Sequence, residues 1–160
     1  MKKTIHILNL ILLVFIIMSC NESQPKKIIP NDQIQKKVTA KDILGNSNYL
    51  AISYGGYRKL SRDFQPTIGE LKEDIKILHA MNIRILRTYN VQLAHASNIL
   101  KAIRELKNED PNFEMYLMLG AWIDCLNAWT DRPVNHNVES AQNAEEIDRA
   151  VALSNEYPDI

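Results

Sequence analysis

The sequence predicts an α/β fold with parallel strands, and three observations support this class. Apolar runs of strand character alternate with stretches whose apolar residues recur at helical spacing. Capping-box spacings mark where helices begin. Polar and aromatic residues gather where the strand-like runs end. Alternating strands and helices form parallel β–α–β units, either in an open doubly wound sheet or in a closed eight-fold barrel.

The first strand and helix occupy the segment that begins at about residue 48. YLAISYGGY, residues 49–57, reads as a strand that two glycines end, and a polar loop follows it. Thr67 and Glu70 have the spacing of a capping box, so we expect a helix to begin there. Its apolar stripe is Leu71, Ile75 and Leu78. Asn82 is the expected stop.

Two further strands and a helix follow. IRILRTYN, residues 83–90, is the second expected strand, and a helix is expected over about 94–108, before Pro111. Its apolar face carries Ala96, Ile99, Leu100, Ile103 and Leu106. The stretch EMYLMLGAWIDC contains the third strand, over Met115–Ala121.

A long polar loop, LNAWTDRPVNHNVESAQ, precedes the last helix. Asn143 and Glu146 repeat the capping-box spacing, and the apolar residues after them recur at helical intervals. The sequence ends at YPDI, where a fourth strand of the alternating pattern would begin.

Residues suited to a site gather at the carboxyl ends of the expected strands. The first strand has Gly55-Gly56 before a polar loop and lacks a G-x-G-x-x-G fingerprint, which argues against dinucleotide binding. In an eight-fold barrel the active site lies at these strand ends. The gathered side chains are Ser53, Tyr54, Tyr57, Arg87, Tyr89, Asn90, Trp122, Asp124 and Cys125.

Composition and charge exclude some classes of partner. The 160 residues favour a single domain, and 46% of them are hydrophobic and 24% charged. Nineteen basic and 19 acidic side chains give a formal net charge of zero. The sequence therefore lacks the basic footprint of a nucleic-acid-binding protein, and we expect no nucleic-acid partner.

The first 19 residues have the pattern of a secretory signal peptide. Lys2 and Lys3 precede a short apolar stretch, and Ser19 is small. The ending Ile-Met-Ser-Cys resembles a bacterial lipobox, which implies cleavage before Cys20 and lipid on its sulfur. The alternative is an uncleaved N-terminal anchor. Either way we expect a protein of the bacterial cell envelope, attached to a membrane outside the cytoplasm, with residues 20–47 as a flexible tether and 48–160 as the domain.

The motifs of the domain resemble those of glycoside hydrolase family 17. They are YLAISYGGY, T-x-x-E-L-x-x-D-I-x-x-L, IRILRTYN, MLGAWID and N-x-x-E-I-x-x-A-V-x-L-x-N-E-Y-P, and they cover residues 49–160. The resemblance implies a (β/α)8 TIM barrel that cleaves or rearranges β-1,3-glucans with retention of configuration.

The resemblance also implies that both catalytic carboxylates lie outside this sequence. In the family the acid is a Glu at the end of the fourth strand and the nucleophile a Glu near the end of the seventh. Asn155-Glu156 lies on the last helix and is not that acid motif. Because a barrel needs about 200 residues or more, we expect the three strand–helix units here to be the N-terminal part of a longer enzyme. The alternative is a complete small three-layer domain.

The expected substrate-binding residues lie at the ends of the three expected strands. Arg87 and Tyr89 share a face, as do Trp122 and Asp124. The resemblance implies that Arg87 and Tyr89 border the sugar site; the alternative for Arg87 is a bridge to a helix. An indole offers a platform for a pyranose and a carboxylate accepts sugar hydroxyls, whereas Trp122 could instead pack under a loop that Asp124 caps. The remaining candidates at the strand ends are Tyr54 and Asn90, and outside this set Trp129 is equally consistent with packing in its loop.

Other chemistries are less well supported by the sequence. Cys125 as a nucleophile would need His136 or His95 as its base, and no thiol-enzyme signature surrounds it. A metal site from Asp124, Cys125, Asp131 and His136 matches no established ligand spacing. Retaining glycosidases hold two carboxyls about 5–5.5 Å apart. The adjacent acids at 73–74, 109–110 and 145–146 read instead as solvated helix surface.

The function expected from these observations is part of a membrane-anchored β-1,3-glucan hydrolase that is inactive by itself. The residues expected to contact glucan are Tyr54, Arg87, Tyr89, Asn90, Trp122 and Asp124, and neither a cofactor nor a metal is expected. The alternative function is a non-catalytic, surface glycan-binding lipoprotein.

Overall fold

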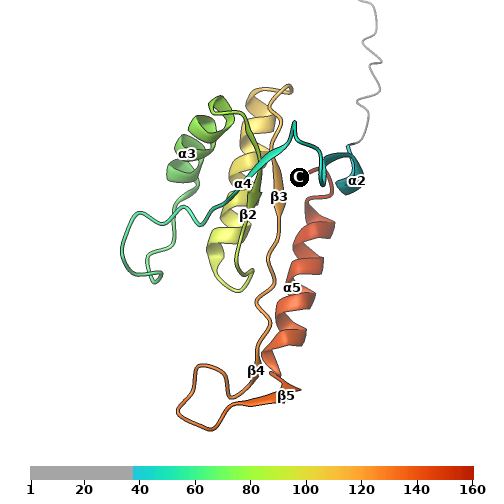
Figure 1. Cartoon of the computed structure of the whole chain (residues 1–160). Helices are drawn as coiled ribbons and strands as arrows, with labels where there is room; N and C mark the ends of the chain where they lie inside the picture. Colours follow the sequence, from blue (N-terminus) through green and yellow to red (C-terminus); the bar gives the residue numbers. More distant parts are fainter. Residues whose placement is uncertain (1–37) are drawn as a thin grey trace, which may run out of the picture. The chain divides into compact units, whose positions relative to one another are not determined.

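The computed structural model describes residues 38–160 (Figure 1). The expected signal peptide, Cys20 and most of the expected tether lie outside the described residues. The elements, in order, are α2 (Ala40–Ile43), β1 (Leu50–Ser53), α3 (Ile68–Ala80), β2 (Ile83–Arg87), α4 (Ala94–Glu109), β3 (Tyr116–Met118), β4 (Cys125–Leu126), β5 (Asn135–Glu139) and α5 (Gln142–Glu156).

A three-stranded parallel sheet organises the fold. Its strand order is β1-β2-β3, and each pair of neighbouring strands is joined through a helix, α3 or α4. In the register of this sheet Arg87 lies beside Ser53 on one side and Met118 on the other. The expected α/β class with parallel strands is therefore confirmed.

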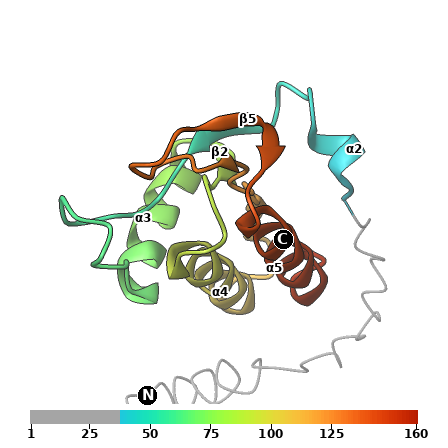
Figure 2. The same ribbon diagram turned by 90° about the horizontal axis from the view of Figure 1, so that it is seen from below.

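The core lies between the sheet and the helices. Figure 2 shows α3, α4 and α5 on one side of the strands. Leu86 of β2 and Leu117 of β3 point to that side, and Leu86 is fully buried. The helices contribute Leu71, Ile75, Ile99, Leu100, Ile103 and Leu106 to the same cluster, and Tyr157, directly after α5, also belongs to it. Burial of these side chains is the main force that holds the helices on the sheet.

The other face of the sheet is open at its carboxyl end. Ser53 and Arg87 are exposed there, and Met118 is 40% exposed. Parallel sheets usually have both faces covered. A strip of exposed side chains across all three strands is therefore unusual for this type of sheet.

The helix α3 begins and ends as its sequence predicts. The backbone amide of Glu70 donates to the Thr67 hydroxyl at 3.3 Å, and the Thr67 amide donates to the Glu70 carboxylate at 2.9 Å. These two bonds complete the predicted capping box. At the other end Asn82 has a φ of +66°, a left-handed conformation that stops the helix.

The structure corrects the expectation for residues 126–142. A polar loop was expected, but two strands, β4 and β5, pair antiparallel there. Their pairing has an irregular register between Cys125 and Leu126, and β4 is only two residues long. A ladder this short leaves no alternating pattern in the sequence, so periodicity could not predict it.

The start of α5 also differs from the expectation. The helix begins at Gln142 after Ala141, and no side chain caps it. Asn143 and Glu146 do not form a capping box, because their side chains are bonded to other parts of the chain. Among residues 38–160, no helix is both long and apolar enough to cross a bilayer.

Candidate functional site

The carboxyl ends of β2 and β3 are drawn closely together. The Thr88 amide donates to the Met118 carbonyl at 3.1 Å, and the Gly120 amide donates to the Thr88 hydroxyl at 3.0 Å. A Cβ at position 120 would collide with the Thr88 carbonyl oxygen. Gly120 therefore makes room for backbone, and this close approach sets the spacing of the side chains that follow each strand.

Arg87 and Tyr89 lie together at the end of β2. The Arg87 guanidinium carbon is 5.8 Å from the centre of the Tyr89 ring, within the range of a cation–π interaction. Both side chains are exposed, and Arg87 lies on the open face of the sheet. Arg87 and Tyr89, which the sequence predicts on one face of the strand, thus form one surface.

Two other expected site residues have partners within the fold. The Tyr54 hydroxyl donates to Asp74 on α3 at 2.8 Å, and Tyr54 packs against the core on the helix side. Burial, followed by the hydrogen bond to Asp74, raises the pKa of Tyr54 above its ordinary range. The buried Asn90 accepts a hydrogen bond from the Leu93 amide at 3.1 Å, which shapes the turn into α4.

Asp124 accepts hydrogen bonds from two indole rings. The Trp122 Nε1 donates to its Oδ2 at 2.7 Å, and the Trp129 Nε1 donates to its Oδ1 at 3.3 Å. The two ring centroids are 6.2 Å apart, with 50° between the planes. Trp122 is 45% exposed and Trp129 82% exposed. The carboxylate thus orients two aromatic surfaces that remain open to solvent.

The first turn of α5 fixes the backbone of Asp124. The Asn143 side chain accepts from the Asp124 amide at 2.9 Å and donates to the Asp124 carbonyl at 2.8 Å. The Ser140 amide donates to the same carbonyl at 3.0 Å. Asn143 is buried and both bonds are partly buried, so they are partly shielded from water.

Glu146 corrects the expectation that the acids at 145–146 are solvated helix surface. Glu145 is exposed, but Glu146 is only 5% exposed. Its carboxylate accepts from the backbone amides of Val91 at 2.7 Å and Trp122 at 3.2 Å. Arg149 lies 3.5 Å from its other oxygen. Sequence reasoning missed this role because its partners lie far along the chain.

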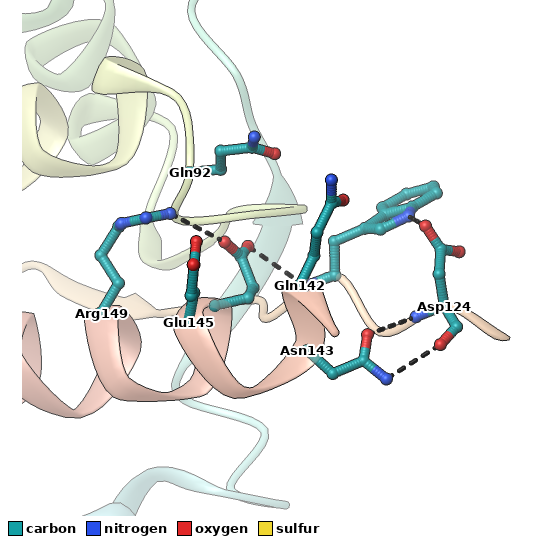
Figure 3. Close-up of a pocket in the computed structure, with 8 residues that line it drawn as sticks. Gln92, Asp124, Gln142, Asn143, Glu145 and Arg149 are labelled. Carbon is teal, nitrogen blue, oxygen red and sulfur yellow. Dashed lines mark hydrogen bonds and ion pairs between the residues drawn. The ribbon is translucent and has the colours of Figure 1, made fainter. Parts of the chain in front are cut away.

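A small polar pocket lies beside this cluster (Figure 3). Its volume is about 70 Å³, and its lining comes from the segments after β2 and β3 and from α5. In Figure 3 the side chains of Gln142, Glu145 and Arg149 extend to the same side of α5, towards Gln92, whereas Asn143 turns to Asp124. The lining residues are Gln92, Trp122, Asp124, Gln142, Asn143, Glu145, Glu146 and Arg149.

Cys125 and the histidines lie apart from this pocket. The Cys125 sulfur is 3.5 Å from Nδ1 of His136 across the β4–β5 pair. His95 is buried on α4, where its Nδ1 lies 2.9 Å from the Tyr57 hydroxyl and its Nε2 has no partner among residues 38–160. Within the same described range, no three His, Cys, Asp or Glu side chains converge as metal ligands would.

The comparisons with known proteins give one strong likeness. No family model matches the sequence, and no curated protein matches it. The chain is similar to the crystal structure of an endo-laminarinase from Formosa Hel1_33_131, with 83% sequence identity and a TM-score of 0.75. The match covers 77% of this chain and 31% of that one. Most of this chain is thus similar to a part of that enzyme, and it spans about a third of the enzyme's length.

Proposed function

We propose that this chain is the N-terminal part of a secreted glycoside hydrolase that acts on β-1,3-glucan of the laminarin type. The observation that carries the proposal is the 83% identity to an endo-laminarinase. Identity at this level, over 77% of the chain, supports a shared substrate class. The resemblance of the motifs to glycoside hydrolase family 17 supports the same class.

The open sheet supports a larger barrel. In a (β/α)8 barrel the inner face of the sheet packs against the strands of the opposite wall. Here Ser53, Arg87 and Met118 form an exposed strip across the inner face. Further strands would cover this strip. The match to only 31% of the laminarinase chain is consistent with the three strand–helix units being the first part of such a barrel.

In this proposal the chain supplies one wall of the sugar groove. Exposed Arg87 and Tyr89 offer guanidinium donors and an aromatic face, and Trp122 with Asp124 forms the adjacent rim. The retaining chemistry needs a general acid and a nucleophile, held about 5–5.5 Å apart. Glu146 holds two backbone amides and is unsuited to either role. Both catalytic Glu residues are then supplied by sequence outside this chain.

A non-catalytic glycan-binding protein is the second candidate. The exposed indoles of Trp122 and Trp129 favour it, since a binding module needs such surfaces and no acid pair. Two assays of the purified chain test both candidates. One measures the release of reducing sugar from laminarin, and the other measures the retardation of the chain in laminarin-containing gels. We expect retardation without hydrolysis. Hydrolysis by the chain itself would show that its own acids are catalytic.

The nucleotide sequence after the codon for Ile160 separates the two candidates. An in-frame continuation that encodes Val-Gly-Asn-Glu soon afterwards supports the hydrolase, because the Glu would supply the acid at the fourth strand. The corresponding longer chain is then expected to release reducing sugar from laminarin. A stop codon at that position supports the glycan-binding protein or a pseudogene.

Membrane attachment through Cys20 is part of the proposal. The lipobox-like ending before Cys20 supports it. A lipid-anchored protein is expected to take up labelled fatty acid in a bacterial host and to partition into detergent. Cys20→Ala should abolish the label. Labelling that survives this substitution would contradict the lipoprotein assignment.

A further inference from the structure

The β4–β5 hairpin presents an exposed ring to which the proposed hydrolase assigns no role. Trp129 lies in the loop between the two strands and is 82% exposed. Its φ is +62°, in the left-handed region that bulky residues rarely adopt, and Asn127 has a φ of +64°. This conformation of Trp129 holds the indole in solvent at a conformational cost, whereas Asn127 adopts the same region readily. Packing does not repay this cost, because the ring is barely buried.

The ring is nevertheless held in a defined orientation. Its Nε1 bonds the same carboxylate that holds Trp122, and the Asp124 backbone is fixed by buried Asn143. The two indoles are thereby placed 6.2 Å apart before any ligand arrives. Such preorganisation reduces the entropy lost on binding.

Polar groups for a ligand lie beside Trp122. The pocket that Trp122 and Asp124 line also contains Gln92 and Gln142, both exposed. Within residues 38–160, neither side-chain amide has a hydrogen-bond partner. A pyranose has apolar faces and a rim of hydroxyls, so it needs aromatic surface and amide groups side by side.

The charge of the side chains that line the pocket determines which class of sugar it can bind. Asp124, Glu145 and Glu146 bring three carboxylates against the single guanidinium of Arg149. A sulfated or uronic-acid sugar would be repelled by this excess of negative charge. A neutral glucosyl unit would not be.

We infer that Trp129 and Trp122, with the amides of Gln92 and Gln142, form a binding site for one glucosyl unit of a neutral β-glucan. The site extends the rim outward, from the strand ends at Arg87 and Tyr89 to the hairpin. It deepens the proposed function and rests on it. Trp129 is a substrate-anchoring residue there, and Asp124 is a positioning residue that acts through the two indoles.

Intrinsic fluorescence reports on this site selectively, because the sequence contains two tryptophans and both lie in it. The full chain is titrated with laminari-oligosaccharides, and a saturable change in emission is expected. Trp129→Ala should weaken binding about fivefold to tenfold, followed through Trp122. Trp129→Phe keeps an aromatic face and should weaken it by about threefold or less. Phe64→Ala is the matched control, since it removes a ring that is 64% exposed elsewhere and should leave the affinity unchanged.

Retardation in laminarin-containing gels distinguishes failure of this site from failure of the proposed function. Retardation of the chain without any change in emission would overturn the two-indole site and leave glucan binding standing. Absence of both signals would overturn both proposals. An unchanged affinity in Trp129→Ala would exclude Trp129 from the site. Binding of a sulfated polysaccharide as tight as that of laminarin would overturn the assignment to neutral sugar.

Discussion

The carboxylate of Glu146 on α5 holds the backbone amide of Val91, 55 positions earlier in the sequence, at 2.7 Å. The second amide on the same oxygen belongs to Trp122. One buried side chain therefore joins the last helix to the segments that follow β2 and β3. The geometry of the rim that Trp122 and Asp124 form depends on these two hydrogen bonds.

Removal of the Glu146 carboxylate should destabilise the fold. Glu146→Ala leaves the buried Val91 amide and the partly buried Trp122 amide without their acceptor, and a buried unsatisfied group costs about 1–3 kcal/mol. We expect the free energy of unfolding, measured in urea, to fall by about 2–4 kcal/mol. Glu145→Ala, at the exposed neighbouring position, should change it by less than about 0.5 kcal/mol. Equal losses of stability in Glu146→Ala and Glu145→Ala would contradict this role of the Glu146 carboxylate.

Asn143 should control the local stability of the hairpin. Asn143→Ala removes both side-chain bonds to the Asp124 backbone, each worth about 0.5–1.5 kcal/mol. Hydrogen exchange measured by mass spectrometry is expected to speed up in peptides that cover residues 121–130. Exposed Asn137 on β5 provides the control, since Asn137→Ala should leave that exchange rate unchanged.

Two glycine substitutions should have opposite effects. Gly120→Ala forces a Cβ against the Thr88 carbonyl oxygen and should lower the free energy of unfolding by about 1–3 kcal/mol. Gly69 lies in α3 with no atom within 4 Å of an added Cβ. Gly69→Ala should raise stability by about 0.5–1 kcal/mol. Thermal melts of both variants measure these changes in stability. An unchanged melting temperature in Gly120→Ala would contradict the close approach of β2 and β3.

Stability should fall on mild acidification through His95. Burial is the main cause that lowers its pKa below the ordinary 6.5, Arg62 adds to the effect, and Glu146 opposes it. The unfolded chain therefore binds the proton more readily, and stability present above pH 6.5 is lost as the pH falls towards the folded-state pKa. The slope for this one group is at most about 1.4 kcal/mol per pH unit.

Urea unfolding at pH 7.5 and 5.5 measures this loss. His95→Gln should show a smaller difference between the two pH values than the unaltered chain. Some dependence should remain, because burial also lowers the pKa of His79. Identical pH profiles for both chains would remove His95 as the cause.

Elements with local signals were predicted well from the sequence. The start of α3 depends on Thr67 and Glu70, which contact each other within one turn, so their spacing contains the needed information. The strand β3 is shorter than the apolar run that predicts it. It lies at the edge of the sheet and pairs only with β2, which limits the length of its ladder.

The contacts of the rim could not be predicted in the same way. Asn143 and Glu146 have the same spacing as a capping box, but their partners are Asp124, Val91 and Trp122, which folding brings near. A residue pattern within one segment holds no information about acceptors and donors on other segments. Trp129 was equally consistent with packing in a loop, and only its exposure and its bond to Asp124 separate the two interpretations.

The outer edge of β1 has a consequence for how this polypeptide behaves among other chains. Leu50–Ser53 pairs with β2 on one side, all four residues are exposed, and the other side has no partner strand among residues 38–160. An edge of this kind is a template on which another extended segment can add. A strand added at β1 would either extend the sheet or join a foreign chain to it in an aggregate. Covering of this edge therefore matters for the solubility of the chain.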